Sequence, residues 1–372
     1  MRIGAEVLEA FYGARVIGRY AIAKHLSDTL GISERFALKK LRTIEKIKDL
    51  KFTIEYPLRA FRLKRVAVFV TNEEKIKKFI EEVRTSEAYP FIRSVLLLIP
   101  VGAAAIYNVP EEVDVRNLSL PKDSYIIEYN DVLRNMTNLR LYGEDSIFDV
   151  GVATSKRNLS LLLQKIEESL NDQELINETE RYVEMLLKLK HRFDWADLAI
   201  IKELEKNPLL SIEDIVSTLK ISFHKVRKHL NKHIVPVLRG LRLKRTPVSK
   251  KLGVYLFLTG KSYSVEVLYA VCRQLVRHPL VLGAGINLHS REFILQIVVS
   301  TQIARDIIDY FRSLLYELDF EFINAFMGVV TAAFTLPYAK FKEYVPKVKW
   351  IWRRRGEVKE NIKEADERGN LS

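Results

Sequence analysis

The chain has 372 residues, of which 48% are hydrophobic and 29% are charged, and its formal net charge at pH 7 is +13. This composition indicates a globular protein with a substantial core and excludes a low-complexity or collagen-like chain. The positive excess favours a polyanionic partner, either nucleic acid or an acidic membrane surface. Cys272 is the only cysteine, which excludes an intrachain disulfide and a CxxC metal site and favours the reducing cytoplasm.

The chain begins with a pattern of three short helices. Residues 3–12 and 18–30 carry apolar side chains at helical spacing, and Gly31 with Ile32 then makes a turn. Ser33 is a favoured N-cap residue, so a third helix is expected from it to about residue 47. Three helices with a tight turn before the third predict a helix-turn-helix unit.

A region of alternating strands and helices follows this unit. Its predicted order is strand 66–70, helix 73–84, strands 92–99 and 103–107, a short helix interrupted by Pro110 and Pro121, and strand 125–129. The uncharged run 94–110 contains Pro, Gly and many β-branched residues, which favours buried strands over a membrane-spanning helix. Residues 158–192 then predict two helices with charged faces that connect the two halves of the chain.

The second half has the same order as the first. Helices are predicted over 195–206, after the cap Ser211 to Leu219, and after the cap Ser222 to about His233. The pattern that follows is strand 252–258, helix 265–276, strands 280–288 and 292–299, helix 302–315 and strand 321–332. This βαββαβ order is the ferredoxin-like arrangement.

A strongly basic segment coincides with the third helix of the second unit. Residues 220–245 hold nine lysines and arginines and no acidic residue. In a helix-turn-helix unit the third helix and the following wing meet the major groove and the flanking phosphates, so the segment predicts a DNA-binding face. The predicted DNA-binding residues are Arg35, Phe36, Lys39, Lys40 and Arg42 in the first unit, and Ser222, Phe223, His224, Lys225, Arg227, Lys228, Lys232, Arg242, Lys244 and Arg245 in the second.

The second unit resembles the Lrp/AsnC family of feast/famine transcription regulators. The resemblance is carried by FDWAD at 193–197, IIKEL at 200–204, SIEDI at 211–215 and LKIS at 219–222, and it extends to about residue 318. It implies a βαββαβ effector-binding domain, double-stranded DNA as the partner, and a small-molecule effector bound where such domains pair. This chain departs from the family in two respects, because Lys220 stands at the usual turn glycine and the family's chains carry one such module.

Candidate sites for small ligands are few. Gly283 and Gly285 are expected in a turn between strands, near the effector pocket that the resemblance implies, although a plain tight turn also explains them. His229 and His233 lie four residues apart on one helix, but no cysteine or carboxylate is near them in the sequence. They are therefore interpreted as part of a DNA-facing or packed helix, and no metal and no cofactor are expected. No P-loop, GxGxxG, HExxH or GxSxG motif occurs, so the chain is not expected to be an enzyme.

The sequence thus predicts an α+β protein of two tandem modules, each a winged helix-turn-helix followed by a ferredoxin-like βαββαβ domain. The predicted boundaries are 1–60 and 61–155 for the first module, 156–192 for the connector, 193–248 and 249–350 for the second module, and 351–372 for a charged tail. The expected function is a cytoplasmic, nucleoid-associated transcription regulator that binds double-stranded DNA, responds to a small-molecule effector and forms a homodimer. Its two third helices are expected to enter major grooves roughly 34 Å apart on an asymmetric site.

Two alternatives stay open. An architectural chromatin factor or an RNA-associated factor would explain the same basic surface without sequence-specific regulation. Some proteins that resemble the Lrp/AsnC fold have lost DNA binding and act as decarboxylases in haem biosynthesis. In that case the basic residues would bind the carboxylates of the substrate.

Overall fold

The computed structural model describes residues 14–46, 50–85, 91–111, 124–134, 156–188, 194–245, 254–276, 280–299 and 301–333, together with Val7, Ala10, Phe11, Asp114 and His278. The predicted charged tail at 351–372 lies outside the described residues. Within these residues the protein is a mixed α+β structure built on antiparallel strands, as the sequence predicts. No helix in the described part of the chain is both long enough and apolar enough to span a membrane.

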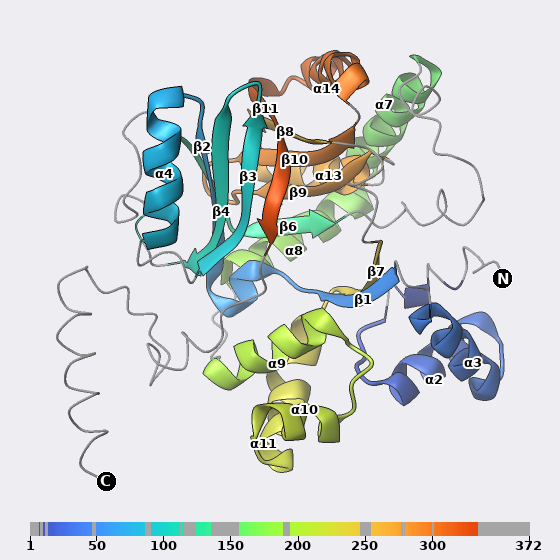
Figure 1. The fold of residues 1–372 in the computed structure, drawn as a ribbon. Helices are drawn as coiled ribbons and strands as arrows, with labels where there is room; N and C mark the ends of the chain where they lie inside the picture. Colours follow the sequence, from blue (N-terminus) through green and yellow to red (C-terminus); the bar gives the residue numbers. More distant parts are fainter. Residues whose placement is uncertain are drawn as a thin grey trace, which may run out of the picture.

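Nine strands form one antiparallel sheet in the order β5-β2-β4-β3-β11-β8-β10-β9-β6 (Figure 1). The bounds of the strands from the first half are β2 Leu63–Val70, β3 Ile92–Ile99, β4 Gly102–Pro110, β5 Tyr125–Tyr129 and β6 Asp131–Arg134. Those from the second half are β8 Val254–Lys261, β9 Val281–Ile286, β10 Glu292–Val299 and β11 Glu321–Ala333. The order β5-β2-β4-β3 in the first half matches β11-β8-β10-β9 in the second, strand for strand. Each half therefore places its fourth strand beside its first and its second strand beside its third.

The segment 125–134 joins the two edges of this sheet. Its first part, β5, pairs with β2, and its second part, β6, pairs with β9 of the other half. Between them, the Asn130 backbone N–H donates to the Ile286 carbonyl at 3.1 Å, and the Asn130 side chain accepts from the Leu288 N–H. One continuous stretch of chain thus closes the sheet on itself, and the inner faces of the two halves enclose a common interior.

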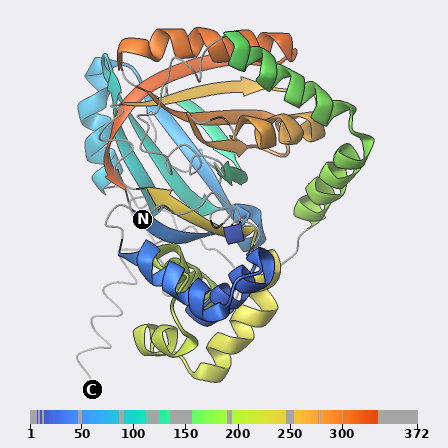
Figure 2. The same cartoon turned by 90° about the vertical axis from the view of Figure 1, so that its right-hand side faces the viewer.

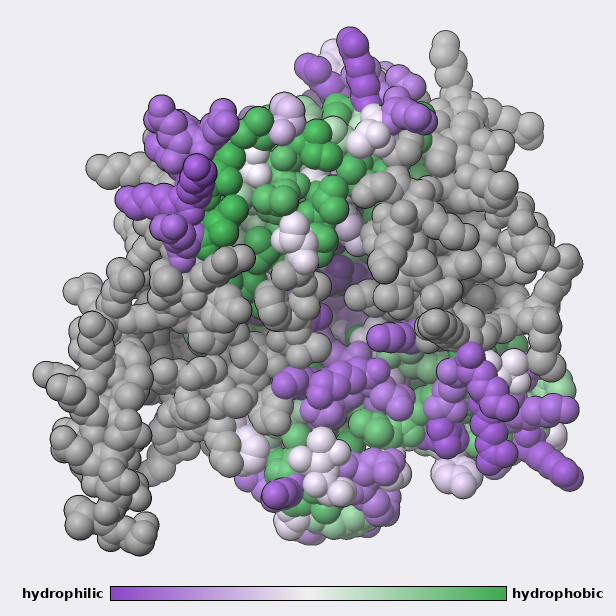
Figure 3. All heavy atoms as spheres, viewed as in Figure 1, coloured by the Kyte–Doolittle hydropathy of each residue, from purple (hydrophilic) through white to green (hydrophobic). Residues whose placement is uncertain are grey.

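Helices cover the outside of the sheet unevenly. In the first half α4 (Glu73–Thr85) packs on β2 and β4, whereas in the second half α13 (Val265–Leu275) packs on β9 and α14 (Ala304–Glu317) on β11. The connector helices α7 (Lys156–Asn171) and α8 (Gln173–Lys188) pack on α13. Between α4 and α14 the outer face of the sheet is an apolar patch in Figure 3, where Leu97 of β3 and Val329 of β11 are exposed.

Two helical units lie side by side beneath the sheet (Figures 1 and 2). The first contains α2 (Arg19–Leu30) and α3 (Glu34–Glu45), and the second contains α9 (Trp195–Lys206), α10 (Ile212–Leu219) and α11 (Phe223–His229). The Gly18 and Arg19 N–H groups donate to the Pro208 and Leu209 carbonyls, so the two units are also joined to each other. After α11 the helix continues as a π-helical turn, η4 (Leu230–Ile234), and a 3-10 turn, η5 (Val235–Val237).

The caps of these helices follow the sequence prediction. The Ser33 and Ser222 side chains accept from the N–H groups of Phe36 and Lys225. Ser211 and Asp214 form a reciprocal capping box at the start of α10. Lys220 adopts φ 52° at the end of α10, a left-handed conformation that glycine adopts without the steric conflict of a Cβ atom.

The prediction of a winged helix-turn-helix implies a separate wing on each unit, and the structure differs from it. The strand after each third helix, β1 (Leu50–Glu55) and β7 (Gly240–Arg245), pairs with the equivalent strand of the other half, in the register Leu50↔Arg245 to Glu55↔Gly240. An isolated strand leaves its backbone N–H and C=O groups without hydrogen-bond partners. Here β1 and β7 supply these partners to each other. The two-stranded sheet β1-β7 lies between the helical units and the nine-stranded sheet (Figure 1).

Arg239 links the second helical unit to both halves of the large sheet. Its guanidinium donates to the Asp131 carboxylate at 2.5 Å, to the Val132 carbonyl at 2.8 Å and to the Tyr182 hydroxyl of α8 at 2.7 Å. Burial lowers the pKa of Arg239, but Asp131 and then Tyr269 outweigh it and raise this pKa well above its usual value. Asp131 is fully buried, so this ion pair must stay intact for the closed sheet to be stable.

We therefore expect Arg239→Leu to lower the free energy of unfolding by about 3–5 kcal/mol, because it leaves the Asp131 carboxylate buried without its partner. Chemical denaturation with circular dichroism detection measures this change. The matched control is Lys188→Leu, which removes the exposed pair with Glu184 on α8 and should leave stability nearly unchanged. Equal effects of the two substitutions would contradict the role of Arg239.

Candidate functional site

A half-open cavity lies inside the closed sheet, between the inner faces of the two halves. The cavity is small: about 270 Å³ of space includes the part that opens to solvent, and the enclosed part is about 20 Å³, which is room for one or two water molecules. Seven strands contribute to its wall, and the lining residues are Arg65, Ile106, Tyr129, Val132, Arg134, Phe257, Gly283, Gly285, Ile294 and Gln296. Apolar side chains form much of the wall, and Arg65, Arg134, Tyr129 and Gln296 supply polar groups, a composition typical of small-molecule sites.

Two arginines in the wall, Arg65 and Arg134, give the cavity a positive charge, and we call it the arginine cavity. Arg65 on β2 is 8% exposed, and its Nε donates to the Asn108 side chain at 2.8 Å. Arg134 on β6 is half-buried. Burial, followed by the charges of Arg65 and Arg242, lowers the pKa of Arg134 well below its usual value, and Glu55 opposes this only in part. Among the described residues, no carboxylate lies within ion-pair distance of Arg65 or Arg134.

A glutamate near these two arginines already has partners of its own. Glu205 of α9 forms a two-point ion pair with Arg93, at 3.2 and 3.4 Å, and accepts a hydrogen bond from the Tyr56 hydroxyl at 2.9 Å. Burial works to raise the pKa of Glu205, but Arg93 and the hydrogen bond from Tyr56 hold it below its usual value. Glu205 is thus paired with Arg93. Glu55 and Glu205 act on Arg134 and Arg65 only without forming an ion pair, so the two arginines can still accept an anion in the cavity.

Tyr129 of β5 places a phenol beside these arginines. It is 5% exposed, and it lines the same cavity as Arg65 and Arg134. Burial raises the pKa of Tyr129, although the charges of Arg65 and Arg134 act in the opposite direction. The phenol is therefore protonated at neutral pH and can donate a hydrogen bond or a proton to a bound group.

The two glycines predicted as ligand-binding residues line the arginine cavity, but not in a turn. Gly283 and Gly285 lie within β9, and the turn comes later, around Asn287. A Cβ atom at Gly283 would lie 2.8 Å from the Leu133 carbonyl oxygen, and one at Gly285 would lie 2.4 Å from the Tyr129 ring. Both positions need glycine because the closing segment 125–134 lies against β9 at close range, so their structural role is clear whatever binds beside them.

The predicted DNA-binding residues of the first unit form the outer face of α3. Arg35, Phe36, Lys39 and Arg42 are exposed, and the Lys40 ammonium lies 5.3 Å from the centre of the Phe36 ring. The apolar residues Ala37, Leu41 and Ile44 are buried on the opposite face. The face thus consists of basic side chains around one exposed aromatic ring.

The predicted residues of the second unit form a similar face on α11. Phe223, His224, Arg227, Lys228 and Lys232 are exposed, Ser222 caps the helix, and the half-buried Lys225 lies over the Trp195 ring at 5.1 Å. The remaining basic residues of the segment lie elsewhere. Arg242 is half-buried and acts electrostatically on Arg134, and Lys244 and Arg245 lie on β7, paired with Lys51 and Leu50.

Comparisons with known proteins gave the following results. No protein-family model matches the chain, and no curated protein matches it. Among solved structures, it is similar to the siroheme decarboxylase NirDL, with 12% identity over 91% of this chain and 96% of that one, at a TM-score of 0.49. It is also similar to the same enzyme in complex with an iron-uroporphyrin III analogue, with 11% identity over 87% and 90% of the two chains, at a TM-score of 0.47.

The expectation that the chain is not an enzyme is contradicted by these comparisons, because both solved structures are of a decarboxylase. The absence of a short catalytic motif was the basis of that expectation. A catalytic site assembled from single residues on several strands has no such motif. The absence of a motif therefore does not exclude an enzyme. DNA binding and transcription regulation remain predictions.

Sequence reasoning missed the arginines of the cavity. Arg65 and Arg134 are 69 positions apart, and neither belongs to a motif that marks a binding site. Arg65 is a charged residue inside an otherwise buried strand, and that was the available signal. A buried charge is expected only where it has a partner or a function.

We predict that Arg134→Met raises the free energy of unfolding by about 0.5–2 kcal/mol, because it removes a charge that burial and neighbouring arginines disfavour. Thermal unfolding in a buffer free of multivalent anions measures it. The control Arg181→Met changes an exposed arginine in the middle of α8 and should have little effect. A destabilised Arg134→Met protein would show that the arginine serves the fold and not a ligand.

Proposed function

We propose that the chain is an enzyme that binds a carboxylate-rich small molecule in the arginine cavity and releases one of its carboxylates as CO₂. The observation that carries the proposal is the positive charge of Arg65 and Arg134, which no described carboxylate matches. A folded protein keeps such charges at a cost in stability, and this cost is commonly tolerated where a ligand supplies the opposite charge.

The arrangement of the two arginines suits more than one carboxylate. Arg65 projects from β2 of the first half, and Arg134 projects from β6 where it pairs with the second half. Guanidinium groups bind carboxylates through two parallel hydrogen bonds, so each arginine can hold one carboxylate arm of the same ligand. The enclosed space is too small for a whole macrocycle, so a large ring would place its carboxylate arms at the arginines and its edge at the open side of the cavity.

Siroheme, a macrocycle with several acetate and propionate arms, is the substrate we propose to test. In its decarboxylation the bond between an acetate methylene and its carboxylate breaks, and the electron pair stays on the carbon. CO₂ leaves and the carbon takes up one proton, so no oxidant is consumed. The arginines of this chain orient the arms, and the apolar wall formed by Ile106, Phe257 and Ile294 keeps water from the reacting bond.

Tyr129 is the residue that we propose as the proton donor. Its pKa is raised by burial, so the phenol keeps its proton at neutral pH and can pass it to the carbon as CO₂ leaves. The positive charge of Arg65, which acts to lower the pKa of Tyr129, then stabilises the phenolate that forms. The tyrosine regains its proton from solvent before the next cycle.

We also propose that the chain consists of two tandem modules, each with a helix-turn-helix and a ferredoxin-like domain, close to the boundaries predicted from the sequence. The repeated strand order in the two halves supports this. The pairing of β1 with β7 supports an internal pairing of the modules, similar to that of two subunits in a dimer.

We expect the purified protein to bind siroheme and to release CO₂ from it, as followed by absorbance and by mass spectrometry of the product. Arg65→Met and Arg134→Met should each weaken binding by about 10- to 100-fold, since each removes a charge-assisted hydrogen bond. Tyr129→Phe should bind within a few-fold of the native protein but react about 10²–10⁴-fold more slowly. Arg181→Met is the matched control and should behave as the native protein.

Failure of siroheme and of simpler polycarboxylates to bind would overturn the proposed function. Binding of siroheme without release of CO₂ would retain the ligand and contradict the reaction. Loss of binding in Tyr129→Phe would assign the phenol to recognition and not to proton transfer.

A second candidate function, nucleic-acid binding, is favoured by the exposed basic faces of α3 and α11. Both faces combine arginines and lysines with an exposed aromatic ring, Phe36 in α3 and Phe223 in α11. Sequence-specific regulation and non-specific architectural binding remain alternatives here, and they differ in their preference among DNA sequences.

If these faces bind DNA, log affinity should fall linearly with log salt, with a slope of magnitude on the order of 5 to 10. Arg227→Ala and Lys228→Ala should each reduce that slope by about 1, whereas the control Lys188→Ala on α8 should not. Fluorescence anisotropy with promoter and scrambled DNA measures both quantities. Affinity that does not depend on salt, or equal slopes in all variants, would contradict the assignment.

A further inference from the structure

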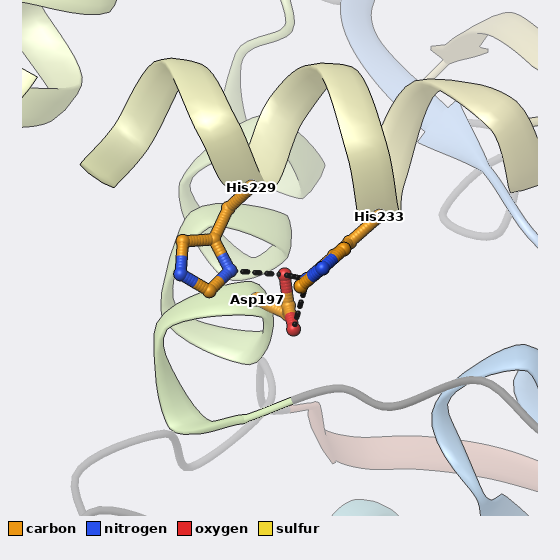
Figure 4. Close-up of side chains that lie close together, drawn as sticks. All are labelled: Asp197, His229 and His233. Atoms are coloured by element: carbon orange, nitrogen blue, oxygen red, sulfur yellow. Dashed lines mark hydrogen bonds and ion pairs between the residues drawn. The ribbon is translucent and has the colours of Figure 1, made fainter. Parts of the chain in front are cut away.

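Three side chains of the second helical unit converge on one point (Figure 4). Asp197 comes from the first turn of α9, His229 from the last residue of α11, and His233 from the π-helical turn η4. The Asp197 carboxylate lies between the two imidazole rings. We call these three residues the His-His-Asp cluster.

One potential metal-ligand atom of each residue lies close to those of the other two. Nδ1 of His229 is 2.7 Å from Oδ1 of Asp197, and Nδ1 of His233 is 3.0 Å from Oδ1 and 3.1 Å from Oδ2. The three ligand atoms all lie within 4.8 Å of one another. Two ligand atoms of a tetrahedral zinc ion, with bonds of about 2.0–2.1 Å, are roughly 3.3 Å apart, so the contact between Asp197 and His229 must lengthen by roughly 0.6 Å to admit an ion.

The surroundings of the cluster resemble those of a metal site. Nε2 of His229 lies 3.8 Å from the Asp194 carboxylate, and metal-binding histidines commonly face a carboxylate with the nitrogen that does not bind the ion. Oδ2 of Asp197 accepts the Asp194 N–H at 2.8 Å, which fixes the carboxylate. Asp197 is fully buried and His229 nearly so, whereas the His233 side chain is 23% exposed and leaves access for an ion and a water.

The backbone between the histidines is unusual. The α-helix gives way to a π-helical turn directly after His229, and this turn contains His233. Such turns change the direction of the side chains that follow and are frequent at functional sites. Here the wider turn accompanies an arrangement in which both rings reach one buried carboxylate of α9.

From this geometry we propose that Asp197, His229 and His233 bind a divalent transition-metal ion of the zinc class, with water as the fourth ligand. Two imidazoles and one carboxylate suit zinc, and the absence of thiolates in the cluster favours it over softer ions. The ion joins the start of α9 to the end of α11, so it fixes the helix that carries the exposed basic face. The proposal does not depend on the arginine cavity or on nucleic-acid binding.

Zinc binding by the full chain, freed of its purification tag and stripped with a chelator, tests the proposal. We expect one equivalent of Zn²⁺ per chain by elemental analysis, a rise in the thermal midpoint on adding Zn²⁺, and a tetrahedral ligand-field spectrum with Co²⁺. His233→Gln should weaken Zn²⁺ binding by about 100-fold or more, and Asp194→Asn, which keeps the helix cap, by about 10-fold.

The matched control is His224→Gln, which changes an exposed histidine of the same helix and should bind Zn²⁺ as the native chain does. Circular dichroism of each variant without metal separates a lost ligand from a lost fold, and the partly exposed His233 makes that variant the more tolerant one. Absence of Zn²⁺ binding by the folded native chain would overturn the proposal and identify a purely hydrogen-bonded cluster. Equal binding by His233→Gln and His224→Gln would overturn it as well.

Discussion

The segment 125–134 is the constraint on which the rest of the structure depends. It pairs with β2 through β5 and with β9 through β6, so a single stretch of chain holds both edges of the sheet. Two consequences follow from this closure. Gly283 and Gly285 must lack side chains where the segment lies against β9. Asp131 is buried so deeply that it needs Arg239 as a partner. Because Arg239 directly precedes β7, the same ion pair fixes the helical units beneath the sheet.

The closure also creates the chemistry of the interior. Apolar rings fill one part of the interior, where Phe69 stacks on Phe326 with the ring centres 4.2 Å apart. The other part contains Arg65, Arg134 and Tyr129. In this low-dielectric setting the positive charges repel each other, and an anionic ligand relieves the repulsion. The anion binding that we propose would therefore offset a cost in the stability of the empty protein, as is expected of a binding site and not of a structural ion-pair network.

The helical units present a different kind of surface from the cavity. Their basic side chains on α3 and α11 are in solvent, where charges cost little and act over a screened range. Inside the second unit, the His-His-Asp cluster ties α11 to α9 by polar contacts in a place where most small helical units rely on apolar packing alone. The catalytic interior and the nucleic-acid surface that we propose are thus physically compatible in one chain, since they would use different residues on different elements.

The sequence alone determined the local structure of this protein. Apolar periodicity predicted many of the described helices and strands to within a few residues, including β3, β10 and α13, because each such pattern reflects a buried face of one element. It did not predict the short strand β6. The sequence also identified the exposed basic faces, since their residues are neighbours on one helix. The tertiary structure decided what comes together: β1 with β7, Arg65 with Arg134, and Asp197 with His229 and His233. These partners are 32 to nearly 200 positions apart in the sequence, and only the closure of the sheet and the packing of the helices bring them within contact distance.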